Sequence, residues 1–196
     1  LHQCNADRQI YDNLATLLST AGYTVLTFDF RGFGGSKGGE YTDFAAQRQA
    51  IMDKMPADVD RAFKFLTEQK NTNPTRIGIL GGSCGVNQAV QAARRHADAV
   101  KALVLLSGGT DADGEAFIKS SPKLPVFGAA SEEDTMAAAS IKKIMSLAAN
   151  ADNMAEMFKG AGHAAFMFAK EPDLEPDIVL WLRMVIQVQS YSLRAQ

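Results

Sequence analysis

The stretch that decides the fold is RIGILGGSCGVNQAV, residues 76–90. It begins as a short apolar run typical of a strand, passes through a glycine-rich turn and continues as a helix-like segment. Gly81-x-Ser83-x-Gly85 lies in the turn, and so sharp a bend needs flanking residues with almost no side chain. We therefore expect Ser83 to stand clear of the sheet in a strained conformation, at the positive end of the following helix.

The composition is ordinary for a globular domain. Of 196 residues, 46% are apolar and 21% are charged, and the net charge is −2. A net charge of −2 does not indicate a basic surface that would bind nucleic acid or an anionic membrane. The apolar runs are too short to span a bilayer. The three histidines and two cysteines lack metal-ligand spacing. The sequence therefore predicts no metal, no cofactor, no nucleic-acid partner and no membrane span.

The chain begins at Leu1 rather than at Met, and no signal peptide is visible. The compartment stays open, with the cytoplasm slightly favoured over a secreted or periplasmic location. The oligomeric state is also open.

Strand-like and helix-like segments alternate along the chain. We expect helices at residues 6–21, 54–70, 85–96, 134–149 and 177–190, and strands at 23–30, 76–81, 100–106, 125–130 and 154–158, with a short polar connection at 107–123. This alternation predicts an α/β fold, one domain over residues 1–196, in which helices cover both faces of a parallel sheet. The connection at 107–123 leaves no room for a cap domain. Loops that follow the strands should meet at one end of the sheet, where ligands bind.

Acyl transfer needs a nucleophile, a base that takes its proton and an acid that orients the base. Ser83 is the candidate nucleophile, and His163 is the only downstream histidine in a loop that follows a strand. Asp134, just after the strand at 125–130, is the preferred acid. Its rivals are Glu132, Glu133 and Asp111.

These segments resemble the α/β-hydrolase family. The resemblance rests on the order of Ser83, Asp134 and His163, on the turn around Ser83, on GYTVLTFDFRGFGGS (residues 22–36) and on GAGHAAF (residues 160–166). It implies a small capless serine hydrolase, carboxylesterase-like and related to the dienelactone hydrolase group, that acts on a small ester or other acyl compound. A site without a cap suits small or accessible esters. Four aromatic residues either line its acyl pocket or pack in the core: Phe28, Phe30, Phe33 and Phe166.

The resemblance also implies where the oxyanion is held. One donor would be the backbone N–H of Cys84, and the other would be the N–H of Gln3 or Cys4. Gln3 stands where the family commonly has glycine.

The two cysteines raise two further alternatives. Some dienelactone hydrolases use a cysteine nucleophile. The glycines two residues before and after the nucleophile, which we call the glycine frame, favour Ser83, because Gly81 and Gly85 flank it, whereas Cys84 is followed two residues later by Val86. A Cys84-dependent hydrolase remains an alternative. By the resemblance, Cys4 and Cys84 both line the oxyanion hole. They either form a disulfide or redox-sensitive pair or are two small buried residues, and the second interpretation is preferred.

One family strand has no counterpart here. In the family sheet, a strand normally lies between the strands that correspond to residues 24–30 and 76–81. We therefore expect the sequence to be a fragment that lacks its N-terminal strands. The alternative is that residues 24–30 pair directly with residues 76–81. A non-catalytic binding or scaffold protein, or an inactive fragment, is the competing functional hypothesis.

Overall fold

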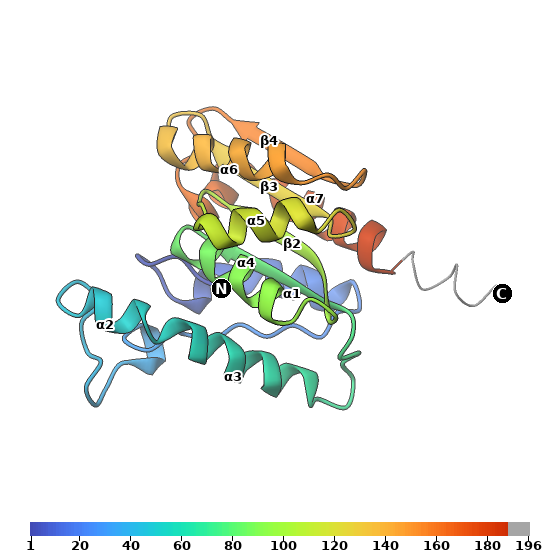
Figure 1. Cartoon of the computed structure of the whole chain (residues 1–196). Coiled ribbons are helices and arrows are strands. Elements are labelled where there is room, and N and C mark those ends of the chain that lie inside the picture. The colour runs from blue at the N-terminus through green and yellow to red at the C-terminus, as the bar shows by residue number, and fades with distance from the viewer. Residues whose placement is uncertain (188–196) are drawn as a thin grey trace.

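The computed structural model describes residues 1–187 and contains a four-stranded parallel sheet (Figure 1). The strand order is β1-β2-β3-β4, and each strand pairs in parallel with the next along the chain. The strands are β1 (Ile77–Gly82), β2 (Val100–Leu106), β3 (Val126–Ser131) and β4 (Met154–Phe158). The predicted α/β class and parallel sheet are confirmed.

Helices connect and cover these strands. The α-helices are α1 (Asp12–Thr20), α2 (Arg48–Met52), α3 (Met55–Thr67), α4 (Cys84–Arg95), α5 (Ala112–Ser120), α6 (Thr135–Leu147) and α7 (Leu174–Leu182). The shorter helical turns are η1 (Arg8–Tyr11), η2 (Gly34–Ser36), η3 (Ala164–Ala169) and the π-helix η4 (Arg183–Gln187). No helix within residues 1–187 combines the length and the apolar character that crossing a bilayer requires.

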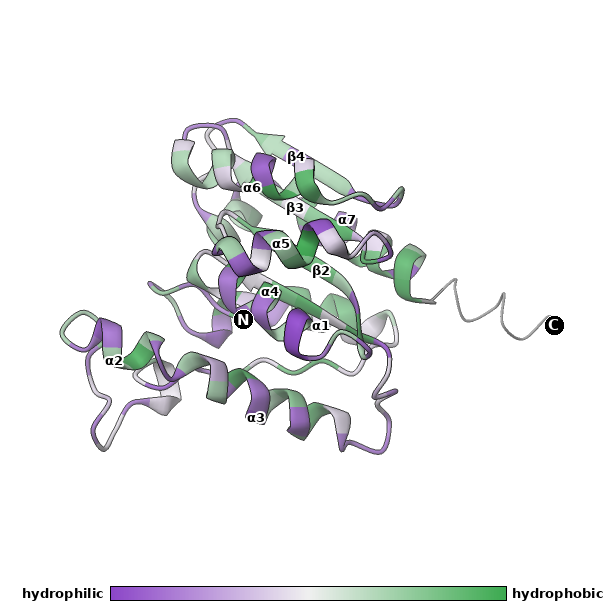
Figure 2. Cartoon of the chain, viewed as in Figure 1, coloured by the Kyte–Doolittle hydropathy of each residue, from purple (hydrophilic) through white to green (hydrophobic). Residues whose placement is uncertain are grey.

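The central strands of the sheet, β2 and β3, are buried on both faces. Leu103 and Leu105 of β2 pack in the cluster formed with α3, α4 and α6, whereas Val104 and Leu106 pack in the cluster formed with α1, η3 and α7. Successive side chains of a strand point to opposite faces, so a strand covered on both sides is apolar at nearly every position. Figure 2 shows mainly apolar colouring along β2, whose one charged residue is Lys101 near its start.

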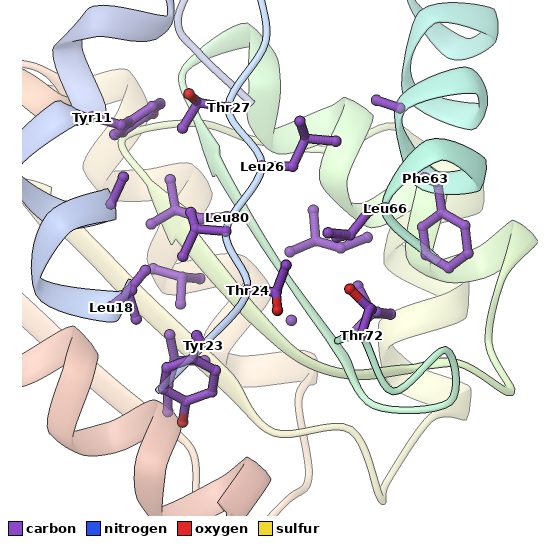
Figure 3. Close-up of a pocket in the computed structure, with 18 of the residues that line it drawn as sticks. Tyr11, Leu18, Tyr23, Thr24, Leu26, Thr27, Phe63, Leu66, Thr72 and Leu80 are labelled. Atoms are coloured by element: carbon purple, nitrogen blue, oxygen red, sulfur yellow. The ribbon is translucent and has the colours of Figure 1, made fainter. Parts of the chain in front are cut away.

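Residues 23–30 form no strand, although their composition predicts one. They run alongside β1 without ladder pairing, so both the predicted strand and the direct pairing of 24–30 with 76–81 are wrong. A cavity of about 450 Å³ separates this segment from β1. Leu18 and Leu80 line it on one side and Phe63 and Leu66 on the other (Figure 3). Strand propensity yields a strand only where a neighbour supplies the ladder.

Leu1 closes one end of this edge of β1. Its amino nitrogen donates to the Leu80 carbonyl at 2.6 Å, and the Gly82 N–H donates to the Leu1 carbonyl at 3.1 Å. These two bonds have the pattern of a parallel ladder one residue long. Leu1 is thus fixed beside the turn that carries Ser83.

Several predicted boundaries change. The connection at 107–123 contains α5, and Asp111 caps this helix by accepting from the Gly114 N–H. The helix expected at 6–21 begins as η1, with Asp7 as its cap, and continues as α1. The helices α2 and η3 were not predicted. The last helix is α7 followed by η4, and residues 188–190 of the predicted helix lie outside the described residues.

Candidate active site

Ser83 occupies the turn between β1 and α4 in a conformation that is rare for a residue with a side chain. Its φ is 53° and its ψ is −118°, and its side chain makes no capping hydrogen bond to α4. A Cβ on Gly81 would lie 2.3 Å from the Gly85 carbonyl oxygen, and one on Gly85 would lie 2.4 Å from the Leu1 oxygen. The glycine frame is therefore a packing requirement, and it holds the serine in a strained position typical of functional sites.

The other candidate groups follow the neighbouring strands. Asp134 follows β3 and His163 follows β4, and the carboxyl ends of parallel strands share one edge of the sheet. His163 Nδ1 lies 2.5 Å from Asp134 Oδ2. Because an ionised carboxylate only accepts, Nδ1 carries the proton and donates, which leaves Nε2 as the lone-pair nitrogen. Both side chains are partly open to solvent.

Two of the rival acids, Glu133 and Asp111, have other partners. Glu133 Oε2 accepts from the Ser131 hydroxyl at 2.8 Å and from the Gly160 N–H at 2.6 Å. These bonds, the Gly160 bond first, lower the pKa of Glu133. Asp111 caps α5, and Glu132 is exposed. Glu133 thus ties the loop that carries His163 to the loop that carries Asp134, a role that the sequence did not suggest.

Within residues 1–187, no hydrogen bond joins the Ser83 hydroxyl to the His163 ring. Such bonds are often long in a free enzyme and shorten when substrate binds.

Three backbone N–H groups near Ser83 lack partners. Among the hydrogen bonds of residues 1–187, none uses the N–H of Gln3, Cys4 or Cys84, the three groups that the resemblance implies as oxyanion donors. Cys84 is the first residue of α4, where an N–H has no acceptor within the helix.

A disulfide joins the two sides of this cluster. Cys4 and Cys84 are bonded, with their Cα atoms 5.8 Å apart. The preferred interpretation, two small buried residues without a bond between them, is therefore wrong, and the alternative of a disulfide is what the structure contains. The bond links the loop at residues 1–5, which we call the N-terminal loop, to the residue that follows Ser83.

His2 holds the N-terminal loop in place through both of its ring nitrogens, a role that the sequence did not suggest. Its Nε2 accepts from the Phe30 N–H at 3.1 Å, so its Nδ1 carries the proton and donates to the Gln3 carbonyl at 2.8 Å. The ring is buried edge-on against Phe30 and Phe33, and burial is the main cause that lowers its pKa. Phe30 and Phe33 are therefore core residues. The signal available in the sequence was a histidine directly before the candidate donors.

The cavity beside β1 does not coincide with the candidate active site. It extends along the side of β1, and none of Ser83, Asp134 and His163 lines it. The candidate site is the open end of the sheet.

A family model described as the alpha/beta hydrolase fold matches residues 1–127. The chain belongs to this family. Among solved structures, the hydrolase fold seen here is similar to a dienelactone hydrolase from Anabaena variabilis, with a TM-score of 0.72, 18% identity, and coverage of 95% of this chain and 82% of that one. It is also similar to the esterase Pf2001 from Pyrococcus furiosus, with a TM-score of 0.65, 19% identity, and coverage of 95% and 81%.

Two curated relatives from Mycobacterium tuberculosis strains, uncharacterized proteins Rv2307c and MT2364, are 35% identical over 107 residues. The match covers 53% of this hydrolase-fold chain and 34% of each relative, so the chain spans about a third of their length.

Proposed function

We propose that the chain is a serine hydrolase that cleaves carboxylic esters or related acyl compounds. The observation that carries the proposal is the shared location of two features. Ser83 stands on a strained, glycine-framed turn, and the His163–Asp134 pair follows strands that end at the same edge of the sheet.

In this mechanism, His163 Nε2 takes the proton of the Ser83 hydroxyl as the serine oxygen attacks the ester carbonyl. The Asp134 carboxylate holds the ring through Nδ1 and stabilises the imidazolium. The tetrahedral intermediate collapses to an acyl-enzyme, and His163 gives its proton to the leaving alcohol. Water then repeats the sequence on the acyl group, which releases the acid and restores Ser83.

The charge that develops on the carbonyl oxygen needs donors that are already in place. The free N–H of Cys84 at the start of α4, together with that of Gln3 or Cys4, supplies them in this proposal. Removal of one such donor costs about 3 to 4 kcal/mol of transition-state stabilisation in serine hydrolases.

The disulfide favours serine over cysteine as the nucleophile. While Cys84 is bonded to Cys4 it has no thiolate, and the thiolate is the reactive form of cysteine. The hydroxyl of Ser83 makes no capping bond and is therefore free for attack.

We extend the proposal to small or accessible esters and to a single domain without a cap. The connection between β2 and β3 holds only α5. Met136 and Phe166, which follow Asp134 and His163 closely in the sequence, are exposed and offer an apolar surface to an acyl group.

Labelling with a fluorophosphonate probe tests the proposal. The protein should be labelled, Ser83→Ala should not, and Cys84→Ala should keep at least part of the labelling. A panel of p-nitrophenyl esters of increasing acyl length then defines the substrate range. Failure of the protein to label would favour the non-catalytic alternative, and loss of labelling in Cys84→Ala but not in Ser83→Ala would favour a cysteine nucleophile.

A further inference from the structure

The side chain of Gln3 joins the N-terminal loop to the loop that carries His163. It is completely buried, and its Oε1 accepts from the backbone N–H of Ala165 at 3.0 Å. Its Nε2 donates to Asn5 Oδ1 at 2.7 Å. Because the Ala165 N–H can only donate, the orientation of the Gln3 amide is determined by this contact.

The loop after His163 needs an acceptor at this point. The helical turn η3 begins at Ala164, and the first N–H groups of a helix have no acceptor within it. The residue before a helix usually caps it with its side chain, bonding the second or third N–H. Here that residue is His163, which makes no capping bond and instead contacts Asp134. Gln3 bonds the second N–H of η3, which is the place of the missing cap.

The backbone beside His163 also requires restraint. Ala164 has φ 50°, an uncommon value for a residue other than glycine. Strained residues persist only where surrounding contacts fix them. A buried amide group costs free energy unless it is hydrogen-bonded, so an apolar side chain of similar size would fill the same space more simply. The hydrogen bonds of Gln3 therefore account for the presence of an amide here.

We propose that Gln3 is a positioning residue that caps η3 from across the fold and thereby sets the place of the His163 base relative to the oxyanion donors. This inference rests on the proposed function. Gln3 supplies a candidate donor through its own backbone and holds the base loop through its side chain. One residue thus fixes the separation of two parts of the site that lie 162 positions apart in the sequence.

The variant Gln3→Met tests this, because it keeps the length of the side chain but has no amide acceptor. Its matched control is Asn153→Leu, since Asn153 Oδ1 likewise accepts a backbone N–H, that of Val126 at 2.8 Å, at the other end of the sheet. We expect Gln3→Met to lower kcat on p-nitrophenyl acetate 10- to 100-fold with KM nearly unchanged, and to move the acid limb of the pH profile of kcat/KM. Asn153→Leu should lower the unfolding temperature without either change.

Amide exchange and ring resonances in NMR separate this inference from the proposed function. In Gln3→Met, the Ala165 amide should exchange faster and the His163 ring signals should shift, whether or not the protein is active. If the parent is not labelled at Ser83, the proposed function fails while these signals still report on the cap. The inference is overturned if Gln3→Met leaves the Ala165 exchange and the His163 signals unchanged. In an active parent, it is also overturned if kcat stays within twofold of the parent value or falls equally in Asn153→Leu.

Discussion

The end of β1 and the side of β1 differ sharply in how well they are packed. At the carboxyl end, three links hold the N-terminal loop. They are the Cys4–Cys84 disulfide, the hydrogen bond that His2 accepts from the Phe30 N–H, and the hydrogen bond that Gln3 accepts from the Ala165 N–H. Along the side, residues 23–28 run past the strand without ladder bonds, and a cavity of about 450 Å³ separates them. The contrast indicates that the N-terminal loop beside the candidate site is held by links to other loops, whereas residues 23–28 contribute no ladder bond along the edge of β1.

The largest expected effect comes from the acid that holds His163. Asp134→Asn should lower kcat by about 10³- to 10⁴-fold, because an amide does not hold the imidazole in the required tautomer or stabilise its charged form. Glu133→Gln is the matched control one residue away, because it weakens only the link between the two loops. Its kcat should fall less than tenfold. Steady-state ester hydrolysis measures both, and equal losses would contradict the assignment of Asp134.

Breaking the disulfide should loosen the end of β1 and leave its side unaffected. The bond closes a separation of 80 residues, so its loss should lower the free energy of unfolding by about 3 to 4 kcal/mol. Urea denaturation with and without a dithiol reductant measures this. Under conditions where the reduced protein remains folded, fluorophosphonate labelling should also slow, because Cys4 and Cys84 no longer hold the two proposed oxyanion donors together. An unchanged labelling rate would show that the proposed oxyanion hole does not depend on the disulfide.

Larger side chains should lower the free energy of unfolding at the carboxyl end of β1 and raise it at the cavity beside β1. Gly85→Ala places a Cβ 2.4 Å from the Leu1 oxygen and should destabilise the fold by about 2 to 3 kcal/mol. Ala15→Leu extends a side chain that lines the cavity and should stabilise the fold by about 0.5 to 1 kcal/mol. Thermal and urea unfolding of the two variants measure the difference. A destabilised Ala15→Leu protein would mean that the cavity cannot accept the added carbons.

Acid pH should lower the free energy of unfolding through His2, by less than the substitutions above. Burial lowers the pKa of His2, and its Nε2 must stay unprotonated to accept from Phe30. The unfolded chain therefore binds a proton below about pH 6.5 that the folded chain does not, and stability falls as pH drops through that range. His2→Gln keeps an acceptor that does not titrate, so part of the decline between pH 7.5 and 5.5 should vanish. An identical decline in the variant would assign the effect to other groups.

Much of the fold could be predicted because local pattern and tertiary packing agree. The run Val100–Leu106 is apolar at nearly every position and forms β2 with the predicted bounds. The glycines around Ser83 specified the turn because no other residue fits there. Residues 23–30 failed for the opposite reason, since their strand propensity has no adjacent backbone to pair with.

The candidate site was only partly readable from the sequence. Ser83, Asp134 and His163 follow strands at recognisable positions, so their placement follows from topology. The roles of His2, Gln3 and Glu133 depend on side-chain contacts with Phe30, Ala165 and Gly160, and no local pattern encodes these. The disulfide likewise could not be predicted, because the spacing of Cys4 and Cys84 in the sequence does not give the distance between them in the fold.

The bond from Gln3 to Ala165 spans 162 positions of the chain, and this separation bears on how the protein acquires activity. Contacts between distant residues close large loops and form late in folding. During synthesis, the N-terminal loop emerges long before the segment that carries His163. The candidate site is therefore incomplete on the ribosome until the segment that carries His163 has been made, and activity should follow, rather than accompany, the folding of the earlier elements.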